Sequence, residues 1–188
     1  MRIDLQLAET AGWRALLTLA QQNAQIFLPE PLEEYVVGLL YRALGSAGSS
    51  TGSCTARFAR QLVEGTRAEH EDLASVGDHC LLFSGLFPDH AIRNSIPVNY
   101  FVQVGRQAYQ DHATRVGGEE RALYRALAAQ YVSVLDILLT MREDGTEGPC
   151  LDGLNAYQLW REAGSYQGWR VLRQLTPSLP ANSTQALH

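Results

Sequence analysis

Apolar residues recur at helical spacing along most of the chain, and one stretch is apolar on every side. In LASVGDHCLLFSGLFP, residues 73–88, the first half carries a single apolar stripe, with Leu73 and Cys80 on the same face. From Leu81 onward, apolar side chains fill the remaining directions as well. This pattern predicts a core helix over about 68–87, with near-complete burial of its second half.

Seven further helices are predicted from the same periodicity and from proline or glycine at the boundaries. They cover 9–27, 31–44, 54–64, 98–114 and 119–143, together with two short helices in 151–175 that are split at Gly164-Ser165. Residues 2–7 alternate between polar and apolar, but no second strand is available to pair with them, so they are expected to lead into the first helix. The glycine-serine stretch 45–53 is predicted to be a loop.

These elements predict an all-α fold in a single domain. It would be a helical bundle, orthogonal or up-down, of about six to eight helices over residues 1–175. The helices at 68–87 and 98–114 are expected at its centre, with the helix at 119–143 across them. Residues 176–188 contain two prolines and few apolar side chains, and they are expected to form a disordered tail.

The charge of the chain argues against several classes of function. Its net charge is −5, and its 15 basic residues are all arginine and form no run. An acidic chain without a basic stretch has no electrostatic footprint for nucleic acid or for an anionic membrane. The absence of lysine excludes a Walker-type phosphate loop, a Schiff-base mechanism and a serine-lysine dyad, because each requires that amine.

Cysteine usage and hydropathy bear on the cellular compartment. Cys54, Cys80 and Cys150 are widely spaced and odd in number, which favours neither a disulfide framework nor a thiolate zinc site. The first residues lack the pattern of a secretory signal, and no apolar run approaches the length of a membrane-spanning helix. A cytoplasmic location, with no nucleic-acid or membrane partner, is the expectation.

Two neighbouring motifs carry a resemblance to other proteins. The run GDHCLLFSGLFPDH, residues 77–90, is followed by VNYFVQVGRQAY, residues 98–109. Together they resemble a pattern found in an uncharacterised all-helical bacterial protein family with no assigned function. The resemblance covers roughly residues 73–109 and implies that these two helices form a unit. It brings no named activity, ligand or functional residue with it.

Acidic residues and histidines gather on the helices at 68–87 and 98–114. Bundles hold metal ions with inward-facing carboxylates and imidazoles, often through a Glu-x-x-His spacing that this chain lacks. The candidate ligands of a mononuclear metal site are Asp72, His79 and His112. The candidates for holding a small ligand are Asp78, His79, Tyr109 and His112. The alternative is that His112 is a core histidine and His79 a half-exposed one, and the sequence specifies no cofactor.

Asp78 follows a glycine and precedes the apolar half of the core helix. If it is buried it needs a partner, because an unpaired carboxylate in a core is costly. An arginine on the following helix, Arg106 in particular, is expected to be that partner. Cys80 belongs to the buried stripe and diverges from His79 by about 100°, which predicts an inert thiol rather than a nucleophile.

Two classes of function stay open on the sequence. The leading one is a non-enzymatic interaction or regulatory module, with a homodimer as one form of it, which predicts an exposed apolar patch. The alternative is a small-ligand- or metal-binding bundle, with oxidoreductase activity as one form of it, which predicts an internal pocket beside His79 and His112. The aromatic side chains suit either a pocket or an oligomer interface. They are Tyr100, Tyr109, Tyr131, Tyr157, Trp160, Tyr166 and Trp169.

Overall fold

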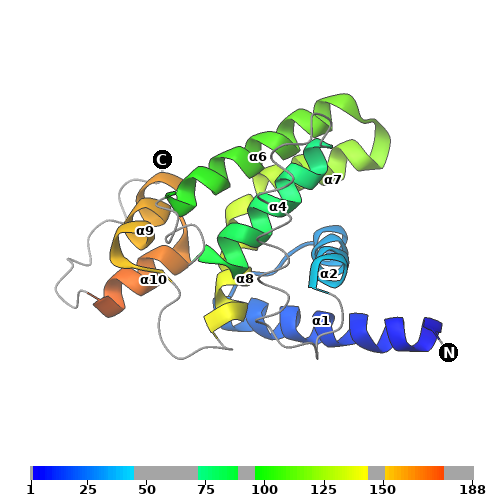
Figure 1. The fold of residues 1–188 in the computed structure, drawn as a ribbon, viewed down its shortest axis with the longest axis horizontal. Helices are drawn as coiled ribbons and strands as arrows, with labels where there is room; N and C mark the ends of the chain where they lie inside the picture. Colours follow the sequence, from blue (N-terminus) through cyan, green and yellow to red (C-terminus); the bar gives the residue numbers. More distant parts are fainter. Residues whose placement is uncertain (1, 45–71, 89–95, 144–150, 176–188) are drawn as a thin grey trace.

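The computed structural model describes residues 2–44, 72–88, 96–143 and 151–175, and in these segments it is built from helices alone (Figure 1). They form eight α-helices and one short π-helical turn, which confirms the all-α fold predicted from the pattern. Four predictions lie wholly or partly outside the described residues: the loop at 45–53, the helix at 54–64, the start of the core helix at 68–71 and the disordered tail at 176–188.

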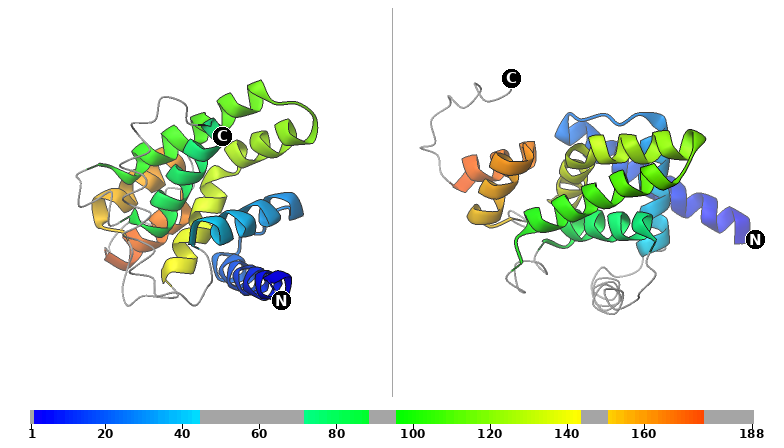
Figure 2. Two further views of the ribbon diagram at one scale, coloured as in Figure 1. Left: turned by 45° about the vertical axis from the view of Figure 1, so that its right-hand side comes forward. Right: turned by 90° about the horizontal axis from the view of Figure 1, so that it is seen from above.

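The helices follow the labels of Figure 1, with bounds that lie close to most of the predicted ranges. They are α1 (Arg2–Ala24), α2 (Glu30–Leu44), α4 (Leu73–Leu86), α6 (Val98–Arg115), α7 (Gly118–Ala129), α8 (Tyr131–Glu143), α9 (Gly153–Gln158), the π-helical turn η1 (Leu159–Ala163) and α10 (Tyr166–Leu175). In both views of Figure 2, α4 and α6 run side by side and α7 folds back along α6. The α9, η1 and α10 elements gather at one end of the molecule (Figures 1 and 2).

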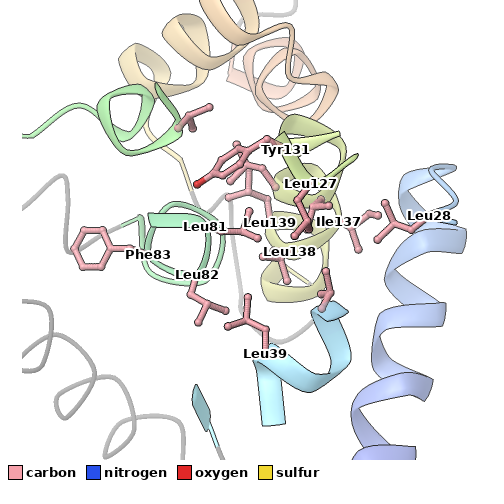
Figure 3. Packing of buried hydrophobic residues seen from close by; sticks show 14 of the residues in the cluster. Leu28, Leu39, Leu81, Leu82, Phe83, Leu127, Tyr131, Ile137, Leu138 and Leu139 are labelled. Carbon is pink, nitrogen blue, oxygen red and sulfur yellow. The ribbon is translucent and has the colours of Figure 1, made fainter. Parts of the chain in front are cut away.

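The core helix α4 is buried as its sequence predicts. Leu81 is fully buried and Leu82 is 1% exposed, and the side chains from Phe83 to Phe87 are buried except for the half-buried Leu86. Figure 3 shows this end of α4 packed against Leu138 and its neighbours on α8. Burial of this many apolar side chains is the main stabilising contribution to the fold.

Glycines let α4, α6 and α8 approach one another closely. A Cβ atom added to Gly77 would lie 2.4 Å from the ring of Tyr109. One added to Gly105 would lie 2.2 Å from the hydroxyl of Tyr131 and 2.7 Å from the Cβ atom of Cys80. Large aromatic rings therefore occupy the space that a side chain at either glycine would need.

The predicted long helix at 119–143 is wrong, because the chain breaks it at Gln130 into α7 and α8, which are bent by 66°. Gln130 has φ −101° and ψ 17°, and its N–H still bonds to the carbonyl of Ala126. Neither proline nor glycine marks the break. Its cause is tertiary: α7 packs along α6, whereas α8 is buried against α1 and α4, and one straight helix does not reach both.

The N-terminal helix starts earlier than its predicted start near residue 9, because α1 begins at Arg2 and includes the alternating residues 2–7. Within the described ranges, no single helix is long and apolar enough to cross a membrane. The α7 and α8 helices reach that length and hydropathy only when they are taken together across their bend.

Candidate functional site

Three of the predicted ligand-binding residues meet in one polar cluster between α2, α4, α6 and α7. At its centre, the hydroxyls of Tyr35 and Tyr109 both donate to Oδ1 of Asp78, at 2.6 and 2.7 Å. The other carboxylate oxygen, Oδ2, lies 3.6 Å from the guanidinium of Arg42. Asp78 therefore joins three helices through side-chain contacts alone. We call Tyr35, Arg42, Asp78, Tyr109, His112 and Tyr124 the tyrosine-aspartate cluster.

Two opposed effects of the environment act on the pKa of the Asp78 carboxyl. Burial raises the pKa of its carboxyl, while the two phenol donors and the charge of Arg42 counteract that rise. Burial and the nearby carboxylate raise the pKa of both Tyr35 and Tyr109, so these phenols stay protonated and act as donors. Asp78 thus accepts two phenol hydrogen bonds at Oδ1 and faces a guanidinium at Oδ2.

The charged partner of Asp78 is Arg42 of α2, and the expectation that Arg106 fills this role is wrong. Arg106 is exposed and follows Gly105, so it is turned by about 100° from the face of α6 that contacts α4. The Arg42 guanidinium also lies over the ring of Tyr35, at 5.8 Å from the ring centroid. The sequence pattern gives no indication that α2 lies close to α4 at this point.

His112 lies at the edge of the same cluster, in the last turn of α6. Its Nδ1 is 3.2 Å from Oδ1 of Asp72, and its Nε2 is 3.7 Å from Oε1 of Glu120. Its ring contacts that of Tyr124 edge to face, with centroids 4.3 Å apart. The side chain is 12% exposed, so His112 faces the interior, as its position on the stripe predicts. These contacts connect the start of α4 with α6 and α7.

The predicted metal site is not assembled. Asp72 and His112 do meet, but among the described residues no three histidine, cysteine, aspartate or glutamate side chains are grouped so as to hold a metal ion. His79 lies seven residues after Asp72, which places it about 10 Å further along the helix axis. Asp72 also has another role, since its Oδ1 accepts from the N–H of Ala74 and caps α4.

The predicted ligand set is brought together only in part. Tyr109 donates a hydrogen bond directly to Asp78. The ring of Tyr124 contacts the rings of both Tyr109 and His112. His79 follows Asp78 and points about 100° away around α4. Its half-buried position and the buried position of Cys80 match the structural roles expected for both.

Sequence reasoning missed Tyr35, Arg42 and Tyr124 as members of this cluster. Tyr35 and Tyr124 lie on apolar stripes, where a tyrosine looks like any other large core residue. The hydroxyls of these two tyrosines are 3.5 Å apart although they are 89 residues apart in the chain. No local pattern carries that information.

A second buried carboxylate, Asp136 on α8, was also missed. It is 3% exposed and accepts hydrogen bonds from the hydroxyl of Ser165 and from the N–H of Tyr166 at 2.8 Å. Ser165 in turn accepts from the N–H of Gly168 at 2.9 Å, which is the geometry of a helix N-cap. Burial raises the pKa of Asp136 to about 6, against the opposing effect of these donors. A lone aspartate inside the apolar run VLDILL was the available signal.

Comparison of the chain with known protein families, curated proteins and solved structures gave no match. The resemblance to uncharacterised bacterial helical proteins therefore stays an expectation. Function has to be inferred from the chain's own side chains.

Proposed function

We propose that this protein is a non-enzymatic interaction module of the cytoplasm, which works through its outer surface. The observation that carries this proposal is the contrast between the paired carboxylate of Asp78 inside and the apolar side chains outside. The chemically versatile residues of the tyrosine-aspartate cluster are engaged with one another, whereas large apolar side chains are exposed.

The interior around Asp78 supports this proposal because both oxygens of its carboxylate have structural partners. Oδ1 of Asp78 accepts from two phenols, and Oδ2 faces Arg42. The imidazole of His112 lies between two carboxylates, those of Asp72 and Glu120. Groups that are bound to each other in this way hold helices together and are costly to separate.

The surface supports the proposal because nine large hydrophobic side chains of the described residues are exposed, and six of them lie near one end of the molecule. These six are Ile96, Tyr100, Leu154, Tyr157, Tyr166 and Leu175. They lie just before or at the start of α6 and on α9 and α10, and α9 contacts both α6 and α10. Aromatic residues enriched on a surface are typical of protein-binding sites.

Native mass spectrometry of the freshly purified chain tests this proposal. We expect peaks at integer multiples of the chain mass, without a bound small molecule or metal. A stoichiometric extra mass that disappears in Asp78→Asn would contradict the proposal and favour the small-ligand- or metal-binding alternative. Leu19→Ser, an exposed position on α1, is the matched control and should leave any such mass in place.

A further inference from the structure

The connection between α1 and α2 presents an exposed phenylalanine from a braced turn. Phe27 is 73% exposed, the largest exposure among the large hydrophobic side chains described. Its neighbour Leu28 is buried, and Leu32 one turn into the next helix is buried as well. The segment is thus packed on its inner side through Leu28 and Leu32, while the ring of Phe27 is turned outward. We call Phe27, Glu30 and Glu34 the α1–α2 corner.

The backbone of this corner is held in one conformation. The N–H of Gln25 bonds to the carbonyl of Gln22 and that of Ile26 to the carbonyl of Gln21, which is a Schellman motif. Gln25 takes the left-handed position usually given to glycine, at φ 57°. The buried Gln21 side chain then accepts from the N–H of Leu28 at 2.7 Å. A strained, braced turn that exposes an aromatic ring is typical of a preorganised binding element.

The rim of the corner is acidic. Glu30 and Glu34 are exposed and four residues apart, so they share one face of α2. Pro29 and Pro31 are exposed on either side of Glu30 and restrict the backbone there. The neighbouring Glu33 is already paired with Arg14, at 3.6 Å. A matching partner needs an aromatic surface for Phe27 and positive charge for the two glutamates.

The C-terminal elements of the same chain offer that chemistry. The Arg161 guanidinium lies over the ring of Tyr157, at 5.7 Å, and donates to its hydroxyl at 2.6 Å. The Arg173 guanidinium lies over the ring of Trp169, at 4.9 Å. Within the described part of the chain, both arginines have an aromatic ring as partner and no carboxylate within ion-pair distance. We call Tyr157, Arg161, Trp169 and Arg173 the aromatic-arginine face.

Helix geometry places the Tyr157–Arg161 pair and the Trp169–Arg173 pair on the same side of the packed α9 and α10 helices. A Cβ atom on Gly168 would lie 2.7 Å from the carbonyl oxygen of Ala156, and one on Gly153 would lie 3.7 Å from Leu175, so α9 and α10 run antiparallel. Tyr157 and Trp169 each follow a contact residue by one position. The residue after a contact residue is rotated by about 100° around its helix. In two antiparallel helices, these two residues point to the same side of the helix pair. The two rings therefore lie on the same side of the helix pair, with an arginine one turn beyond each, and they contact Trp160 and Tyr166 respectively.

We propose that copies of this chain associate head to tail, with the α1–α2 corner of one copy docked on the aromatic-arginine face of the next. Phe27 would pack against the exposed aromatic surface of this face, and the two glutamates would face the two arginines. This inference rests on the proposed function and names its partner. Because the two surfaces differ, each associated pair keeps one free corner and one free face, so the contact does not limit the assembly to dimers.

Sedimentation velocity over a concentration series tests this inference with two variants. Phe27→Ser breaks the corner, and the double variant Arg161→Glu with Arg173→Glu breaks the face. Each alone should raise the dissociation constant at least ~10-fold, as truncation of an interface anchor does. An equimolar mixture of the two variants should form dimers but nothing larger, because it restores one intact junction per pair.

Leu19→Ser, which is exposed on α1 outside the corner, is the matched control and should associate like the wild type. All variants should keep the wild-type unfolding midpoint, because the replaced side chains lie at the surface. A wild-type chain that stays monomeric at the highest concentration overturns the head-to-tail inference alone. So does a mixture that stays monomeric. A bound small molecule or metal in the native mass spectrum instead overturns the proposed function.

Discussion

Within the described residues, the half-buried Asp78 and the buried Asp136 are both satisfied by protein groups, but by different partners. Asp78 on α4 is satisfied by two tyrosine hydroxyls and a partly exposed arginine. Asp136 on α8 is satisfied by the hydroxyl of Ser165 and by the first backbone N–H of α10. The Asp78 carboxylate joins helices through side-chain contacts. The Asp136 carboxylate, on α8, provides a hydrogen-bond acceptor for the N-terminus of α10.

The comparison shows why a carboxylate in a core is not by itself a sign of chemistry. Burial raises the pKa of both carboxyl groups, yet both oxygens of each carboxylate have protein partners. The two aspartates also connect different helices. Asp78 lies among the long helices, and Asp136 fixes the C-terminal α10 to α8. Removing either carboxylate should therefore loosen a different part of the fold.

The largest expected effect is that of Asp136→Leu at pH 5. Leucine is similar in size but accepts no hydrogen bond, so it leaves the hydroxyl of Ser165 and the N–H of Tyr166 buried without an acceptor. We expect a loss of about 3 kcal/mol in the free energy of unfolding. Asp136→Asn, which keeps one acceptor, should lose about 1 kcal/mol. Denaturant unfolding followed by tryptophan fluorescence measures both, and equal losses would contradict this account.

The pH dependence of Asp136 is the next largest effect. Its pKa in the folded protein is about 6, raised from 3.8, so protonation favours the folded state. The stabilisation is fully present below pH 3.8 and is lost as the pH rises through 6. Relative to Asp136→Asn, the wild type should lose about 3 kcal/mol between pH 4 and pH 7. A difference that is flat or rises with pH would show that the hydrogen bonds outweigh burial.

Glycine substitutions compare the packing of the two regions. A Cβ on Gly168 would meet the carbonyl oxygen of Ala156 at 2.7 Å, and backbone atoms shift less easily than side chains. A Cβ on Gly77 would meet only the ring of Tyr109. Gly168→Ala should lower the free energy of unfolding by about 3 kcal/mol and Gly77→Ala by about 2 kcal/mol. Gly117→Ala, at a glycine with open space around it, is the control in thermal unfolding, and the reverse order would contradict the comparison.

The smallest effect separates the two phenols of the tyrosine-aspartate cluster. Tyr109→Phe removes a fully buried donor to Asp78 and should cost about 1 kcal/mol. Tyr35→Phe removes a donor to the same oxygen from a half-buried position, so it should cost less. Tyr100→Phe, an exposed tyrosine, is the control and should leave the unfolding midpoint unchanged. If Tyr35→Phe costs more than Tyr109→Phe, burial does not set the strength of these bonds.

Local patterns predicted the helices better than they predicted the contacts between helices. The all-round apolar end of α4, from Leu81 to Phe87, correctly indicated burial, because enclosure leaves a mark on every position of a helix. The break at Gln130 left no such mark, since packing on two different neighbours causes it.

The candidate site was only partly readable for the same reason. Asp78, Tyr109 and His112 could be identified from their positions on α4 and α6. Arg42 could not, because its contact with Asp78 depends on where α2 lies. His79 entered the predicted metal site from its residue type and its place on the core helix. It lies about 10 Å from Asp72 along the helix axis, and among the described residues no third ligand joins Asp72 and His112.

The central claim is that Asp78 and its phenols hold helices together and do not serve chemistry. A double-mutant cycle of Asp78→Asn and Tyr109→Phe, measured by denaturant unfolding, tests it most directly. Both single variants should be less stable than the wild type, with a coupling energy of about 1 kcal/mol or more. Single variants that match or exceed the wild-type stability would contradict the claim, because residues kept for binding or catalysis often reduce stability.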